Sequence, residues 1–192
     1  AVIESLEARG LRVIPAFASG LDARPAVKAF FMDRGEPIVD AVVSLTGFSL
    51  VGGPAYNDTD AAQEMLEALD VPYLAVQGLE FQSLQDWESS SMGLMPVEAT
   101  MMVAIPELDG ATGSMVFGGR SELSAGEKFD MQPAPERIDR LADRVARLVG
   151  LRHTPIAERK VAIVLFNFPP NSGAAGTAAH LSVFESLFNT LS

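Results

Sequence analysis

The sequence predicts an α/β fold: a Rossmann-like, mostly parallel sheet flanked by helices on both faces. Short apolar runs bounded by turn residues recur along the chain, and segments with helical periodicity lie between them. The apolar runs alternate little with polar residues, which is typical of strands buried on both faces. The chain has 192 residues, of which 48% are hydrophobic, so we expect one core and a single α/β domain over residues 1–192.

The predicted strands have the length and apolar composition of buried strands. They are residues 12–17, 39–45, 72–77, 114–118 and 160–168. The polar stretch 119–135 follows the fourth of these segments, and it is predicted to form a β-hairpin or an irregular excursion.

The predicted helices carry apolar residues at helical spacing, and several have recognisable ends. They are residues 23–33, 60–69, 84–91, 96–103, 136–149 and 176 to the end of the chain. Ser83 with Asp86, and Asp60 with Gln63, have the spacing of capping boxes, and Gly150 is placed to end a helix. The helical patterns at both ends of the chain, AVIESLEARG and LSVFESLFNTLS, lack an outer cap. We therefore expect a domain truncated at both ends.

Composition excludes several functions. The formal net charge is −11, and an acidic protein repels polyanions, so nucleic acid is not an expected partner. Cysteine is absent, which excludes disulfides and thiolate metal sites. The longest apolar runs are only as long as a strand, so no transmembrane segment is expected. We predict a cytoplasmic protein.

Ligands of such sheets bind beyond the carboxyl ends of the strands, so the segments after the predicted strands form the candidate site. In the stretch NFPPNSGAAGTAAH (residues 167–180), glycines and a helix start would offer free backbone amides to an anion. The candidate binding residues there are Asn171, Gly173, Gly176 and Thr177. The alternative is a tight turn in which Asn171 or Thr177 only caps a helix.

Acidic residues and a histidine are the candidate catalytic groups. Glu107 and Asp109 would lie on one side of an extended segment, where they could bind Mg²⁺ or accept protons; the alternative is an Asp-Gly turn. Glu80 lies between Leu79 and Phe81, and a carboxylate in an apolar neighbourhood suits an acid or a base, unless it is a solvated rim residue. His180 could ligate a metal or carry a proton, or it could be a packed or capping residue.

Residues 72–120 (PYLAVQGLEFQ to MVFGGR) and 164–191 (VLFNFPPNSGAAGTAAHLSVFESLFNTL) resemble the large, porphyrin-binding H subunit of magnesium chelatase. They resemble the large subunit of cobaltochelatase more loosely. The resemblance includes residues 6–31 and therefore covers essentially the whole chain. The ending FGGR of residues 117–120 is nearer to the magnesium enzyme. Because H subunits are several times longer, the resemblance implies a fragment of such a chain.

The resemblance implies a ligase that inserts Mg²⁺ into protoporphyrin IX for chlorophyll or bacteriochlorophyll synthesis in photosynthesis. ATP would be hydrolysed by the AAA+ partner subunits I and D, and the isolated fragment would be inactive. Insertion removes two protons from pyrrole nitrogens, so acids beside a flat apolar pocket are the expected tools, and Glu80, Glu107, Asp109 and His180 have that chemistry. The alternatives are a cobaltochelatase large subunit acting on a corrinoid precursor and a non-catalytic scaffold domain of the chelatase.

Overall fold

The computed structural model of the chain describes residues 1–53, 55–121, 130–166, 176 and 182–192. Contacts divide it into two compact units, Ala1–His153 and Thr154–Ser192. The single domain expected over residues 1–192 stays a prediction.

The first unit contains most of the regular structure. Its helices are α1 (Val2–Glu7), α2 (Arg24–Phe30), α3 (Thr59–Leu69), α4 (Leu84–Ser89), α5 (Pro96–Glu98), the π-helix η1 (Ala99–Ala104), α6 (Ile105–Asp109) and α7 (Pro135–His153). Its strands are β1 (Met32–Asp33), β2 (Glu36–Pro37), β3 (Val42–Ser44), β4 (Gly52–Gly53), β5 (Tyr56–Asn57), β6 (Tyr73–Ser83), β7 (Met115–Arg120) and β8 (Met131–Pro133). The second unit contains the 3₁₀ helix η2 (Ile156–Glu158) and α8 (Val183–Leu191).

A mixed four-stranded sheet with the order β3-β6-β7-β8 forms the centre of the first unit. The strands β3 and β7 both pair with β6 in parallel, whereas β8 pairs with β7 in antiparallel orientation. The predicted α/β class is confirmed, with a sheet that is mixed. The pairing of β7 with β8 also confirms the hairpin predicted for the region that follows the fourth strand.

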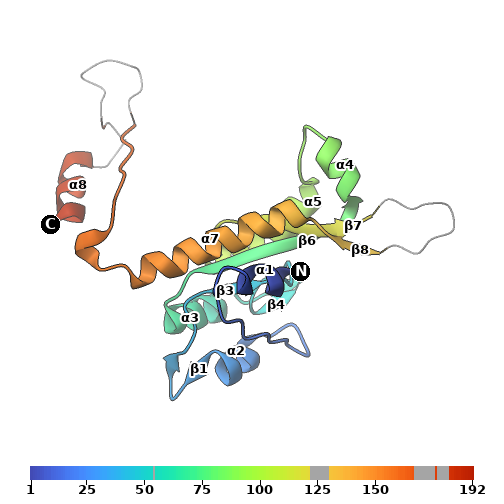
Figure 1. Ribbon diagram of the computed structural model, residues 1–192, viewed down its shortest axis with the longest axis horizontal. Helices are drawn as coiled ribbons and strands as arrows, with labels where there is room; N and C mark the ends of the chain where they lie inside the picture. The colour runs from blue at the N-terminus through green and yellow to red at the C-terminus, as the bar shows by residue number, and fades with distance from the viewer. Residues whose placement is uncertain (54, 122–129, 167–175, 177–181) are drawn as a thin grey trace. The chain divides into compact units, whose positions relative to one another are not determined.

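Alternate side chains of β6 enter two different cores. Leu74 and Val76 pack with residues of α1 and α7, whereas Tyr73 and Ala75 pack with residues of α2 and α3. Figure 1 shows this arrangement, with α7 along β6 and with α2 and α3 on the other side of the sheet. Because both faces of β6 are covered, its sequence is apolar without alternation over this stretch. The expectation of helices on both faces is therefore met in this unit.

Two predicted strands are absent from the described residues. Residues 12–17 follow an irregular path: Pro15 lacks an amide hydrogen for a ladder, and Phe17 is 86% exposed. Residues 160–166 also have no regular structure. The last two residues of that prediction, 167 and 168, lie outside the described part of the chain.

The helix ends are set by side chains that the sequence predicted only in part. Ser83 caps α4 by accepting a hydrogen bond from the amide of Asp86 at 2.9 Å, as predicted. The predicted cap Asp60 was wrong, because Asp58 caps α3 by accepting from the amide of Ala61 at 3.1 Å. The predicted stop at Gly150 was also wrong, since α7 continues to His153. An internal glycine costs a helix about 1 kcal/mol, and burial of the apolar face of α7 offsets that cost.

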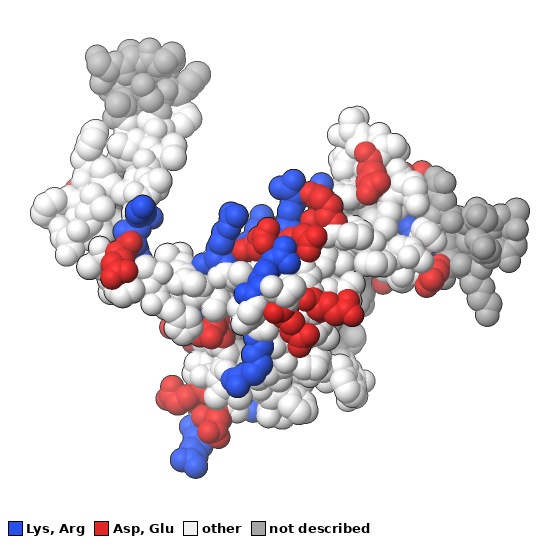
Figure 2. Space-filling model, in the orientation of Figure 1, with Lys and Arg blue, Asp and Glu red and all other residues white. Residues whose placement is uncertain are grey.

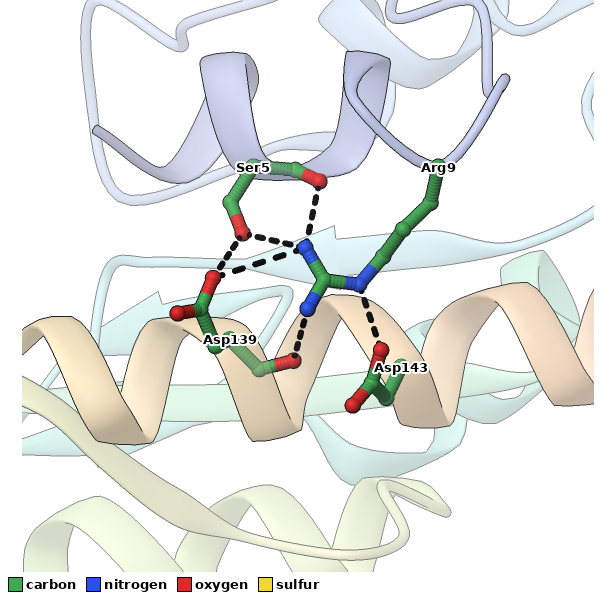
Figure 3. A network of polar contacts seen from close by, with 4 residues as sticks. All are labelled: Ser5, Arg9, Asp139 and Asp143. Atoms are coloured by element: carbon green, nitrogen blue, oxygen red, sulfur yellow. Dashed lines mark hydrogen bonds and ion pairs between the residues drawn. The ribbon is translucent and has the colours of Figure 1, made fainter.

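A polar network joins α1 to α7 beside the apolar contact between them (Figure 3). The guanidinium of Arg9 donates to Asp143 Oδ1 at 2.6 Å, to the backbone oxygen of Asp139 at 3.0 Å and to the backbone oxygen of Ser5 at 2.9 Å. The hydroxyl of Ser5 donates to Asp139 Oδ1 at 2.8 Å. Figure 2 shows acidic and basic side chains interspersed over this part of the surface. The network therefore fixes the orientation of α1 on α7.

We expect Arg9→Ala to lower the melting temperature of the protein at neutral pH. The hydrogen bond from Arg9 holds the pKa of the Asp143 carboxyl below its usual value. A carboxylate with a lowered pKa stabilises the fold above its ordinary pKa, and this contribution is lost as the pH falls through the lowered value. The difference in melting temperature should therefore shrink between pH 7 and about pH 3. Arg12→Ala, at an exposed arginine, is the control, and an equal effect of both substitutions would contradict the account.

Candidate functional site

The strand β6 ends in a bulge that exposes Glu80 and Phe81. Leu79 pairs with Gly119 and Ser83 pairs with Arg120, so the intervening residues have no partner in the ladder to β7. Adjacent side chains of a regular strand point to opposite faces, whereas here Glu80 and Phe81 are both exposed. The bulge therefore leaves a carboxylate and an aromatic ring exposed on consecutive residues.

Close packing next to the bulge explains one glycine of the FGGR ending. A Cβ atom at Gly119 would lie 2.7 Å from the Cβ atom of Leu79, a separation that real Cβ atoms do not adopt. Leu79 is itself fully buried in a cluster with Leu84 and Val116. Glycine at position 119 thus lets β7 approach β6 at the residue where the bulge begins.

The carboxylate of Glu98 holds the bulge from inside. This side chain is 0% exposed. Its Oε1 accepts from the amide of Phe81 at 3.3 Å, and its Oε2 accepts from the amide of Met95 at 3.1 Å and from the side-chain amide of Gln82. A buried carboxylate is tolerated only when hydrogen bonds replace its lost hydration, and these donors supply them. Glu98 was not predicted as a site residue, although its place two residues after Pro96 matches the third position of a helix start.

A second buried carboxylate, Asp109, holds the loop after β3. It is 1% exposed, and its Oδ2 accepts from the amide of Leu50 at 2.8 Å. Its Oδ1 and the hydroxyl of Tyr73 are buried without a hydrogen-bond partner among the described residues. Burial raises the pKa of Tyr73 to about 12. The nearby Ser44 hydroxyl lowers this pKa somewhat, although it makes no hydrogen bond to Tyr73, and the negative charge of Asp109 raises it further. Both groups are therefore interior polar atoms.

Glu107 and Asp109 do not lie on the same side of the chain. The expected extended segment was wrong, because residues 105–109 form the helix α6, in which side chains two positions apart diverge. Glu107 is exposed and Asp109 is buried. The alternative of a turn is closer to the structure, since Gly110 ends α6 in the left-handed conformation with φ +110°. Among the described residues, no cluster of three or more acidic or histidine side chains could hold a metal ion.

The loop after β3 also meets the segment after the first predicted strand. The amide of Ala23 donates to the oxygen of Leu50 at 3.0 Å, and the amide of Gly52 donates to the oxygen of Leu21 at 2.7 Å. An isolated bridge between Asp22 and Val51 completes this pairing. Two of the predicted candidate loops are therefore joined by backbone hydrogen bonds.

One short segment contacts both the bulge of β6 and the loop after β3. This segment, residues 96–109, comprises α5, η1 and α6, and we call it the brace. Glu98 near its start binds the bulge of β6, and Asp109 at its end binds the loop after β3. Between them, Met102 of η1 packs beside Gly47 in that same loop. The middle of the brace is a π-helix, a conformation that is rare and is often found at functional sites.

The glycine-rich stretch is described only at Gly176. The other residues predicted there, Asn171, Gly173, Thr177 and His180, lie outside the described part of the chain. Gly176 has φ +70°, and its amide donates to the oxygen of Phe166 at 2.8 Å. Of the helix predicted from residue 176 onward, the described residues contain α8, which begins at Val183 after the non-helical Ser182 (φ −81°, ψ 82°).

A cavity of about 450 Å³ lies at the ends of α3, α6 and α7. Gln63, Leu66, Asp109, Gly110 and Arg152 contribute to its lining, and the exposed bulge residues do not. The bulge is therefore an open surface, distinct from this cavity.

In the described part of the chain, no helix has both the length and the apolar character needed to cross a bilayer.

The arrangement of a mixed sheet, flanking helices and a braced strand end defines a cobaltochelatase-like fold. The solved structure described as the catalytic subunit of cobaltochelatase from Mycobacterium tuberculosis superposes with a TM-score of 0.65 and 29% identity, over 85% of this chain and 14% of that one. The model of the family described as CobN/Magnesium Chelatase matches residues 1–192. The chain belongs to this family.

Curated relatives come from the magnesium-chelatase and the cobaltochelatase branches of the family. The chain is 56% identical to the H subunit of magnesium chelatase from Cereibacter sphaeroides and 54% identical to that from Rhodobacter capsulatus, in both cases over 100% of this chain and 17% of the relative. It is 32% identical to the aerobic cobaltochelatase subunit CobN of a Sinorhizobium species, over 94% of this chain and 14% of the relative. The chain thus spans less than a fifth of the length of these relatives.

We expect Asp109→Ala to lower the free energy of unfolding by about 1 to 3 kcal/mol, because the amide of Leu50 loses its buried acceptor. Asp109→Asn should cost less, since its side-chain oxygen can still accept that bond. Tyr73→Phe removes a hydroxyl that lacks a partner, so its effect should stay within about 1 kcal/mol. Urea unfolding of the purified variants measures all three. A larger loss for Tyr73→Phe than for Asp109→Ala would contradict this description of the interior.

Proposed function

We propose that the chain is part of the porphyrin-binding H subunit of a magnesium chelatase, which inserts Mg²⁺ into protoporphyrin IX for chlorophyll or bacteriochlorophyll synthesis. The greater identity to magnesium-chelatase subunits than to the cobaltochelatase subunit supports magnesium over cobalt. The parallel ladders of β3, β6 and β7 with their flanking helices serve as a Rossmann-like core that carries the site.

The exposed bulge carries this proposal further than any other feature of the first unit. A porphyrin is a flat apolar ring that must lose two pyrrole protons when Mg²⁺ enters. The ring of Phe81, which is 52% exposed, offers a flat apolar surface, and the adjacent carboxylate of Glu80 is exposed and able to accept a proton. The two functions that insertion needs thus occur on neighbouring residues.

The remaining candidates take different roles in the proposal. Glu107, exposed on α6, is available as a second acid or as a ligand that guides the incoming Mg²⁺. We assign Asp109 a structural role instead, because it is buried and bound to the amide of Leu50. Two further roles stay predictions. One is porphyrin or anion binding by Asn171, Gly173, Gly176 and Thr177, and the other is proton transfer by His180.

The proposed reaction needs components beyond this chain. We propose that the AAA+ subunits I and D hydrolyse ATP and drive the insertion, in the cytoplasm. A pocket that several parts of a longer subunit share would be lost in the isolated chain. Tests of the proposed reaction therefore need the full-length H subunit with its partner subunits.

We expect Glu80→Gln to lower kcat of Mg²⁺ insertion about 100-fold or more, since a positioned acid or base contributes on that scale. The dissociation constant for deuteroporphyrin should change by less than about two-fold, because glutamine keeps the size of the side chain. Steady-state insertion assays and porphyrin fluorescence titrations measure the two quantities. Glu88→Gln, at an exposed glutamate of α4, is the matched control. A Glu80→Gln variant with the kcat of the wild type would refute the role of Glu80.

Phe81→Ala should instead weaken porphyrin binding. An aromatic contact contributes about 0.5 to 1.5 kcal/mol beyond burial of area, so the dissociation constant should rise by roughly 2- to 12-fold. Phe81→Tyr keeps the ring and should bind porphyrin as the wild type does. If both Glu80→Gln and Phe81→Ala leave binding and insertion unchanged, the bulge does not face the substrate and the scaffold alternative gains support.

A further inference from the structure

Glu98 is a fully buried carboxylate whose bonds go mostly to the bulge of β6. The bulge removes Phe81 from the ladder to β7, so the amide of that residue needs another acceptor, and Glu98 Oε1 supplies it at 3.3 Å. Glu98 Oε2 accepts from the side-chain amide of Gln82, which is the next residue of the bulge. That same amide also donates to the backbone oxygen of Gly93 at 3.4 Å, which ties the bulge to the loop before α5.

A cap for α5 alone would not require this arrangement. The helix cap uses only the bond from the amide of Met95 to Glu98 Oε2, and an exposed polar side chain can make such a bond without burial. Burying a carboxylate is costly unless several donors meet it. Here two of the three donors belong to the bulge. The burial of Glu98 is therefore explained by the conformation of residues 80–82 rather than by the cap.

We propose that Glu98 is a positioning residue for metal insertion: it fixes the peptide between Glu80 and Phe81 so that the Glu80 carboxylate and the Phe81 ring face the substrate together. This inference rests on the proposed role of Glu80. Glu98 itself does not touch the substrate, because its side chain is 0% exposed. It acts through the amide of Phe81, which is the residue next to the proposed acid.

The proposal predicts that Glu98 and Glu80 act as one unit. Replacing Glu98 by glutamine puts an amide group where the carboxylate met the donors of Gln82 and Met95, so the bulge loses its fixed conformation. In the full-length H subunit with its partners, we expect Glu98→Gln to lower kcat about 10-fold, with little change in KM for porphyrin. We expect the double variant Glu80→Gln/Glu98→Gln to be no slower than Glu80→Gln alone.

The outcomes of this double-mutant cycle separate the two proposals. If Glu98 has only a structural role, the losses of the two variants should multiply, and the positioning role is refuted. If Glu98→Gln has the kcat of the wild type while Glu80→Gln is slow, only the positioning role is refuted. If Glu80→Gln has the kcat of the wild type, the proposed function of the bulge fails first, and the positioning role fails with it.

A second variant keeps the test decisive if Glu98→Gln does not fold. Gln82→Leu removes a donor to Glu98 from the bulge and leaves the carboxylate in place. The same cycle with Glu80→Gln should again show no added loss in the double variant. Hydrogen exchange provides a readout apart from activity: the amide of Phe81 should exchange faster in Gln82→Leu than in the wild type. Unchanged exchange together with multiplied losses in kcat would overturn the proposal.

Discussion

Two buried carboxylates on one short helical segment hold the strand-end loops of this domain. Glu98 accepts backbone and side-chain amides of the β6 bulge, and Asp109 accepts the amide of Leu50 after β3. Neither carboxylate has an ion-pair partner among the described residues. Their burial is therefore stabilised by oriented donors of the loops themselves, which makes loop conformation and carboxylate burial depend on each other. The exposed pair Glu80 and Phe81 owes its position to this dependence.

Strong local patterns in the sequence were sufficient for the framework of the fold. The long helix α7 and the apolar strand β6 follow from helical periodicity and from an unbroken apolar run, and the cap at Ser83 follows from its spacing to Asp86. The predicted strands at 12–17 and 160–168 failed in their described residues because a strand forms only against a partner. Apolar composition does not reveal whether such a partner exists.

The site was predictable only in part, because it depends on contacts between segments distant in sequence. Glu80 stood out by its apolar neighbours, but the bulge that exposes it arises from a shift in register against β7. Glu98 gave only the signal of a helix start, and its role depends on residues 17 and 16 positions away. The pairing of Glu107 with Asp109 failed because α6 replaced the expected extended segment.

Hydrogen–deuterium exchange of the full-length H subunit, with and without bound deuteroporphyrin, tests most directly whether the braced strand end faces the substrate. The account predicts slower exchange on porphyrin binding in a peptide that spans residues 79–83. The exchange rate of a peptide that spans residues 1–9, which contain α1, should not change. Protection elsewhere in the subunit with no change at residues 79–83 would contradict the account.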